Sequence, residues 1–326
     1  MGFSTILIGG GGWWATRELE NAMEHPLPVT SPELFDLSAG ESVAGIAQAL
    51  ADKGWLEHPL YFRIEAARRG VTSRLQVGTY EIAPGSTLKT LLQKFVKGDV
   101  KRYQYTIIEG TTFLQLRTQM ANLPGVISTL RKFDDGELMR RIGAGDQRPE
   151  GQFFPSTYYY LHRTTDLELL RRAYHEMQHL LGNAWQARQS GLPYRSVCDA
   201  LIMASIVEKE TGRESERPQI AGVFIRRLKQ GMKLQTDPTV IYGLGSTFDG
   251  NLRKVDLLRD TPFNTYTRLG LPPTPIAMPG ARAIHAALNP AQGESLYFVA
   301  RGDGTHEFSD TLAAHQRAVR KFQLKR

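Results

Sequence analysis

A glutamate at the end of an apolar run is the residue of this sequence best placed for acid/base chemistry. The run LIMASIV, residues 201–207, is followed directly by Glu208 and, two residues later, by Glu210. On a helix, Leu201 and Ala204 fall within about 40° of Glu208, whereas Glu210 points to the opposite side. Burial against an apolar surface raises the pKa of a carboxyl group, which can then act as a general acid near neutral pH. The sequence therefore favours Glu208 as the reactive group, with a structural glutamate paired to an arginine as the alternative.

Polar side chains that follow this helix are candidates for binding a ligand. In the segment LQTDPT, we predict a short strand that ends at Gln235 and a helix with Asp237 as its N-cap and Pro238 as its first residue. Asp237 therefore either contacts a ligand or only caps this helix. Other side chains of the kind that hydrogen-bond sugars are Tyr242, Asn264 and Tyr266.

A second motif suggests different chemistry. Residues 175–179 read HEMQH, which matches the H-E-x-x-H pattern of zinc peptidases. His175 and His179 share one face of a helix, but Arg171 and Arg172 lie on that face too. We therefore expect surface histidines and no bound metal, and keep a zinc peptidase as an alternative function.

The N-terminal third of the chain is predicted to form a small helical unit over residues 35–99. Helix signals place one helix after Ser42, a second that closes at Gly70, and a third between a cap at Ser86 and a stop at Gly98.

The rest of the chain alternates long helices with short strands. Alternating residues predict a strand over 102–108, and Thr165 and Glu168 form a capping box for a long helix. A long, proline-rich irregular segment precedes a helix over 281–288. The last predicted elements are a strand over 295–300 and a helix capped by Ser309 or Asp310. The pattern predicts an α+β fold.

Composition limits the classes of function. The chain has 326 residues and a net charge of +7, which suits an anionic partner, yet it contains no patterned basic helix that would indicate nucleic-acid binding. Cys198 is the single cysteine, so an internal disulfide and a cysteine-based zinc cluster are excluded. Because it lies in the apolar helix, we expect Cys198 to be buried.

The N-terminus is apolar but short. FSTILIGGGGWWA, residues 3–15, is too glycine-rich and too short for a spanning helix, which needs about 20 apolar residues. Its two tryptophans suit a membrane interface. We interpret it as the outer end of a membrane anchor, with a mere apolar leader as the alternative.

Several of these motifs together resemble a known family. ASIVEKE followed by VFIRRLKQGMKLQTDPTVIYGLG closely resembles the YceG-like endolytic murein transglycosylases. The resemblance continues through FNTYTRLGLPPTPIAMPG and LYFVARGDGTHEFSDTLAAH. It reaches back to EGQFFPSTY and to a LysM-like unit around GTYEIAPGSTLKTLLQKFVKG, and thus covers nearly everything from about Leu34 onward. Three positions depart from the family pattern: Ser156, Thr274 and Met278.

The resemblance implies a domain order and a reaction. Residues 1–33 would be the remnant of an anchor and linker, 34–100 a LysM-like subdomain, and 101–326 a mixed α/β catalytic domain. Glu208 would be the single catalytic glutamate and would cleave the β-1,4 bond between N-acetylmuramic acid and N-acetylglucosamine without metal or cofactor. The residues implied to line the groove are Gln235, Asp237, Tyr242, Asn264 and Tyr266.

The resemblance also implies a setting for the reaction. The protein would be a single-pass inner-membrane protein whose catalytic domain faces the periplasm or exterior. It would cut nascent strands, leave 1,6-anhydro ends and thereby terminate glycan elongation, with peptidoglycan synthases as partners. A peptidoglycan-binding protein without catalytic activity is the alternative from another class.

Overall fold

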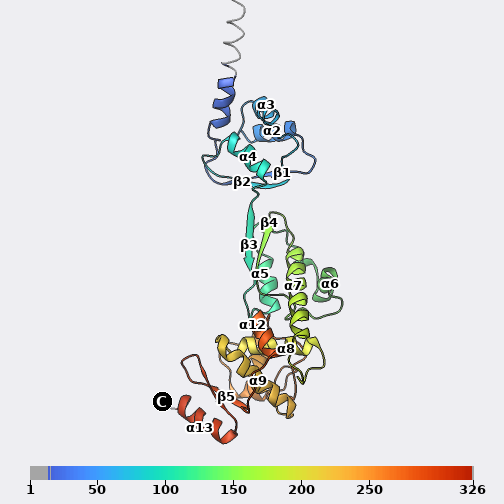
Figure 1. Cartoon of the computed structure of the whole chain (residues 1–326), viewed down its shortest axis with the longest axis vertical. Helices are drawn as coiled ribbons and strands as arrows, with labels where there is room; N and C mark the ends of the chain where they lie inside the picture. The colour runs from blue at the N-terminus through green and yellow to red at the C-terminus, as the bar shows by residue number, and fades with distance from the viewer. Residues whose placement is uncertain (1–13, 15, 325–326) are drawn as a thin grey trace, which may run out of the picture. The chain divides into compact units, whose positions relative to one another are not determined.

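The computed structural model describes Trp14 and residues 16–324 (Figure 1). They divide into two compact units: unit 1 comprises the described residues up to Tyr103 together with Tyr159–Arg163, and unit 2 comprises Gln104–Tyr158 and the described residues from Thr164 onward. The predicted end of an anchor at residues 3–15 lies, except for Trp14, outside the described residues. Within the described part of the chain, no helix is both long enough and apolar enough to span a membrane.

Unit 1 is a small α+β unit. Its two strands, β1 (Glu33–Leu37) and β2 (Gly78–Ile82), pair antiparallel. The three predicted helices are present as α2 (Val43–Asp52), α3 (Pro59–Arg68) and α4 (Leu88–Lys97), and residues 16–24 form a further helix before them. The core is built around Phe62, Tyr80 and Phe95, which are fully buried. Met23 and Leu27, in the segment assigned to a linker, are also buried in this core.

A two-stranded sheet made of β3 (Arg102–Thr106) and β4 (Thr157–Leu161) contains the boundary between the units. The strand predicted over 102–108 is therefore confirmed but two residues shorter.

Unit 2 is mainly helical. Its first helices are α5 (Phe113–Met120), α6 (Asp135–Ile142), α7 (Asp166–Gln186), α8 (Val197–Glu210) and α9 (Arg217–Lys229). They are followed by α10 (Asp237–Leu244), α11 (Lys254–Leu258), α12 (Ala281–Leu288), the antiparallel pair β5 (Tyr297–Ala300) and β6 (His306–Ser309), and α13 (Leu312–Phe322). The described residues thus form helices with small antiparallel sheets, which confirms the α+β class.

Helix α8 lies at the centre of unit 2. All residues from 200 to 207 are buried, and α8 packs against α7, α9, α10 and α12 (Figure 1). A helix that is apolar on all sides is stable only when other elements cover every side. The core therefore fixes the position of the last turn of α8, which carries Glu208.

Several local predictions were wrong. The residues 232–236 form no strand, because the backbone of Gln235 turns into the left-handed region at φ 51°. The N-cap of α10 is Thr236 and not Asp237, which lies inside the first turn. Cys198 is exposed, because it lies in the first turn of α8 before the buried stretch begins.

The remaining error concerns helix caps. Thr87 rather than Ser86 caps α4, and its side chain accepts a hydrogen bond from the Thr90 N–H. Thr311 caps α13, because Ser309 belongs to β6. Neighbouring serine, threonine and aspartate residues have similar capping preferences, so the sequence does not determine which of them is the N-cap. The conformation of the preceding segment determines it.

Candidate active site

Glu208 lies in the last turn of α8, where two other segments meet its carboxyl group. Arg217 at the start of α9 places Nη2 2.8 Å from Glu208 Oε1, and the Gly280 N–H donates to Oε2 at 3.0 Å. Both charged side chains are buried, with 5% of Glu208 and 6% of Arg217 exposed. Glu208 is thus paired to an arginine, as expected of a glutamate with a purely structural role. Its pKa is nevertheless raised.

Burial is the largest influence on the pKa of Glu208 and raises it. The Gly280 N–H and the charge of Arg217 act in the opposite direction, because they stabilise the carboxylate. Glu109 raises the pKa further, and its Oε2 lies 3.6 Å from Arg217 Nη2. Arg217 is therefore shared between two carboxyl groups, and Glu208 keeps the raised pKa that a general acid needs.

Glu109 is a neighbour that the sequence reasoning missed. It lies 99 residues before Glu208 in the chain, and only the fold brings the two together through Arg217. The structure thus places a second carboxyl group, about half exposed, beside the arginine partner of the first.

The guanidinium group of Arg217 has spare donors. Its Nε and Nη1 atoms are buried and have no hydrogen-bond partner among the described residues. Buried N–H groups nearly always find an acceptor. Arg217 therefore keeps buried donors that neither Glu208 nor Glu109 uses.

Glu210 has different surroundings, as the helical spacing predicted. It accepts a hydrogen bond from Thr236 Oγ1, and burial raises its pKa to about 7. The buried guanidinium of Arg227 donates to Leu234 O at 2.7 Å in the same turn. Glu210 and Arg227 therefore hold the turn that contains Gln235.

That turn presents Gln235 to solvent. Its neighbours Leu234 and Thr236 are buried, whereas Gln235 is exposed and has its N–H bonded to Thr265 O at 3.1 Å. Nearby, the Tyr266 hydroxyl donates to Asp237 Oδ1 at 2.6 Å. The structure thus brings Gln235, Asp237 and Tyr266 together on adjoining segments.

Asn264 supports this arrangement from inside. Its side chain is fully buried, and its amide nitrogen donates to the carbonyl oxygens of Leu257 and Arg259 at 3.0 and 2.7 Å. Its amide oxygen accepts from the Tyr266 N–H at 2.8 Å. This geometry favours a positioning role for Asn264 over the direct contact with sugar that the resemblance implied.

Tyr242 faces a third carboxyl group. Its hydroxyl donates to Glu150 Oε2 at 2.9 Å, and the Phe113 N–H donates to Glu150 Oε1 at 3.0 Å. Glu150 is 7% exposed, and burial raises its pKa to about 7. Sequence reasoning missed Glu150, although a glutamate at the start of the aromatic stretch EGQFF was a signal for a buried carboxyl group.

The loop that carries Gly280 pairs with the loop after β3. Met278 is buried, its N–H donates to Thr111 O at 2.8 Å, and its carbonyl oxygen accepts from the Gly110 N–H at 2.9 Å. Only backbone atoms make these bonds, so the departure from the family pattern at Met278 leaves them intact.

The HEMQH motif lies on the surface of α7. His175, Glu176 and His179 are exposed, as predicted. Across the part of the chain that the structure describes, no three histidine, cysteine or carboxylate side chains group as metal ligands.

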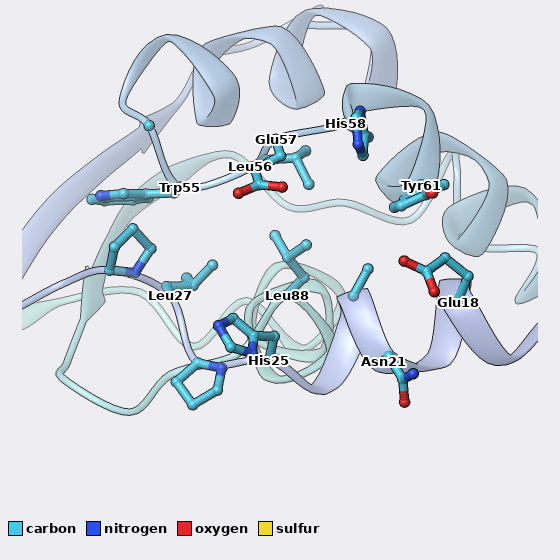
Figure 2. Close-up of a pocket in the computed structure, with 14 residues that line it drawn as sticks. Glu18, Asn21, His25, Leu27, Trp55, Leu56, Glu57, His58, Tyr61 and Leu88 are labelled. Atoms are coloured by element: carbon cyan, nitrogen blue, oxygen red, sulfur yellow. The ribbon is translucent and has the colours of Figure 1, made fainter.

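Unit 1 contains a hollow of about 420 Å³ (Figure 2). Glu57 and His58 lie on one side of it, and Asn21 and His25 on the other. These four side chains are exposed, and the ring of Trp55 is 5% exposed. The hollow therefore lacks a buried polar group comparable to Glu208.

Comparison with known proteins places this geometry in context. The model of the YceG-like family matches residues 35–321. A Bacillus subtilis protein named endolytic murein transglycosylase is 31% identical over 333 residues, which are 97% of this chain and 91% of the relative. A Streptococcus pneumoniae protein of the same name is 27% identical, and the match covers 96% of this chain but 62% of the relative.

A solved structure agrees with the sequence comparisons. The crystal structure of a YceG-like protein of Listeria monocytogenes is similar with a TM-score of 0.57 and 28% sequence identity. The match covers 89% of this chain and all of the solved chain.

Proposed function

This chain belongs to the YceG-like family, and we propose that it is an endolytic murein transglycosylase, a lyase that cuts peptidoglycan glycan strands internally. The observation that carries the proposal is the buried carboxyl group of Glu208, which meets the Arg217 guanidinium and the Gly280 N–H at the end of α8 and whose pKa burial raises. The similar proteins of Bacillus subtilis and Streptococcus pneumoniae carry the name of this activity.

In the proposed reaction, Glu208 acts first as an acid and then as a base. Its proton goes to the glycosidic oxygen as the bond from that oxygen to C1 of N-acetylmuramic acid breaks. The resulting carboxylate accepts hydrogen bonds from the Gly280 N–H and the Arg217 guanidinium, which favour its charged form. It then takes the proton of the C6 hydroxyl as O6 bonds to C1, which closes the 1,6-anhydro ring without water.

The other site residues have supporting roles in this proposal. Gln235, Asp237, Tyr242 and Tyr266 contact the glycan, and Asn264 holds the loop that carries Tyr266.

The finer assignments extend the same proposal. Residues 1–33 belong to an anchor and a linker whose Met23 and Leu27 pack against the next unit, 34–100 form a LysM-like unit that grips glycan, and 101–326 form the catalytic domain. The enzyme acts on nascent strands outside the inner membrane, next to peptidoglycan synthases, and thereby ends strand elongation. The family resemblance and the tryptophan-bearing apolar N-terminal sequence support this setting.

The decisive variant is Glu208→Gln, which keeps the shape of the side chain but removes the transferable proton. General acid–base catalysis contributes about 10²- to 10⁴-fold, so formation of anhydro-muropeptides from purified sacculi should fall by that factor. Mass spectrometry of the digest measures it, and undiminished anhydro products would refute the role of Glu208.

Two controls separate the alternatives. His179→Ala removes a residue of the HEMQH motif and should leave glycan cleavage intact, whereas a zinc peptidase would lose its activity. Products with reducing ends in place of anhydro ends would show hydrolysis, the reaction that uses two carboxyl groups. A protein that binds sacculi but creates no new ends would be a binding protein only.

A further inference from the structure

Unit 2 contains a cavity of about 590 Å³ that is lined by residues other than Glu208. It lies at the starts of α5 and α6, beside α10 and the loop before Glu150. Its lining includes Phe113, Leu114, Arg148, Glu150, Tyr242 and Phe263. Pockets that hold small organic ligands commonly measure about 300–1,000 Å³.

One part of the lining is apolar. Leu114 is 72% exposed although it is a large aliphatic side chain. Phe263 packs edge-on against Tyr242, with ring centroids 4.8 Å apart. A pyranose ring has apolar C–H faces, so these side chains offer a surface of matching character.

The other part is polar and converges on Glu150. Its buried carboxyl group accepts from the Phe113 N–H and from the Tyr242 hydroxyl, and Arg148 lies on the rim. Burial raises the pKa of Glu150 to about 7, so the protonated carboxyl group is accessible near neutral pH. The pair of Glu150 and Tyr242 can then both donate and accept hydrogen bonds, as the hydroxyl and acetamido groups of an amino sugar require.

The loop 109–113 connects this cavity to the surroundings of Glu208. Glu109 at its start lies beside Arg217, the partner of Glu208, and Phe113 at its end donates to Glu150. Four extended residues span at most about 14 Å. A glycan bound at Glu208 can therefore reach the cavity along one short loop.

We propose that this cavity is a saccharide subsite, in which Glu150 and Tyr242 hydrogen-bond an N-acetylhexosamine unit next to the sugars that flank the cleaved bond. This inference rests on the proposed function, because it takes the glycan strand as the ligand. Leu114 and Phe263 contact the apolar face of that sugar, and Phe113 fixes the carboxyl group through its N–H.

The test measures glycan binding in a Glu208→Gln background, where cleavage cannot consume the ligand. Dissociation constants are determined by calorimetry for stem-peptide-free glycans of one disaccharide repeat and of several repeats. Tyr242→Phe removes only the hydroxyl, and Leu114→Ala shortens a largely exposed side chain. In each variant, the preference for the long glycan over the short one should fall by about threefold to tenfold, the worth of one hydrogen bond or a small apolar contact.

Leu312→Ala is the matched control, since Leu312 is another exposed leucine at the start of a helix, α13. It should leave the length preference unchanged, and thermal melts check that all variants are folded. A purely structural effect of Tyr242→Phe would weaken binding of both glycans equally and leave their ratio unchanged.

An unchanged ratio in both variants would overturn the subsite. The same calorimetry is repeated with glycans that carry stem peptides, and a ratio that falls only for those would also overturn the subsite, because the cavity would then bind peptide. The proposed function fails on a different result, the absence of anhydro ends when the wild-type protein digests sacculi.

Discussion

The charge state of Glu208 results from effects that raise its pKa and others that lower it. Two donors, Arg217 and the Gly280 N–H, favour the carboxylate, while burial and the nearby Glu109 favour the protonated form. A buried ion pair offsets desolvation only when its geometry is good and all partners are satisfied. Here Arg217 interacts with two carboxyl groups and keeps nitrogen atoms without a partner among the described residues. The effect of burial is therefore larger than that of the ion pair, and the pKa of Glu208 is raised.

A first prediction concerns the pH dependence of activity. Glu208 must be protonated to act as an acid, so activity is lost as pH rises through its raised pKa. Glu109→Gln removes a negative neighbour that raises this pKa, so the loss should begin at lower pH in the variant. A profile of kcat/KM against pH measures the shift.

Glu294→Gln is the control, because Glu294 is an exposed carboxyl group in unit 2 outside the contacts of Glu208. A shift of the Glu109→Gln profile to higher pH would contradict the electrostatic account. Loss of anhydro products in Glu109→Gln would show that Glu109 takes part in the chemistry itself.

A second prediction concerns the backbone of Gln235. A non-glycine residue in the left-handed region costs about 1 kcal/mol or more, and the strain persists only where neighbouring residues enforce it. Gln235→Gly should therefore leave the free energy of unfolding equal or raise it by up to about 1 kcal/mol. Because the side chain is lost, glycan cleavage should fall by about tenfold.

Gln235→Ala separates the two effects, since alanine keeps the strain but lacks the amide. It should lose activity without gaining stability, as urea titrations and product assays would measure. Full activity in Gln235→Gly would show that glycan cleavage requires the backbone turn and not the side chain of Gln235.

Among the elements, α8 connects the core to the reaction site. Ser205, which is fully buried, accepts from the Ile276 N–H at 3.0 Å and donates to Ile202 O at 2.7 Å. This bond ties the proline-rich segment to α8 four residues before Gly280. The same helix thus positions both the carboxyl group of Glu208 and the backbone donor that meets it.

A third prediction tests the packing of α9 against the segment that follows α12. A Cβ added at Gly222 would lie 2.5 Å from the carbonyl oxygen of Ala291, a backbone atom that cannot easily move. Gly222→Ala should therefore destabilise the protein by about 1–3 kcal/mol, the usual range for overpacking. The free energy of unfolding in urea measures it.

Gly182→Ala is a matched control within helix α7, because nothing lies within 4 Å of the added Cβ. It should stabilise the protein by about 0.5–1 kcal/mol, since alanine favours the helix. Equal stability changes in the two variants would mean that α9 can move away from residue 291.

At the scale of the whole molecule, the net charge of +7 should affect association with an anionic polymer. We predict that the amount of Glu208→Gln protein bound to purified sacculi falls as salt rises from about 0.01 M to about 1 M, because the screening length shrinks from about 30 Å to about 3 Å. Sedimentation with sacculi measures it. Binding that stays constant over this range would show that short-range contacts alone hold the glycan.

Each unit has its own hydrophobic core. One contains Phe62, Tyr80 and Phe95, and the other surrounds α8. The sequence indicated a separate N-terminal unit from its helix signals. That Met23 and Leu27 join its core was not visible, because Leu27 stands alone between Pro26 and Pro28 and the short helical stretch that carries Met23 was assigned to a linker.

The sequence by itself determined the features that depend on neighbours along the chain. The bounds of α12, the capping box before α7 and the different directions of Glu208 and Glu210 all follow from helical spacing and local hydrogen bonds. The tertiary structure alone decided which distant groups meet. Glu109 beside Arg217, Glu150 with Tyr242, and the left-handed turn at Gln235 depend on buried contacts between segments up to about a hundred residues apart, and no local pattern encodes such contacts.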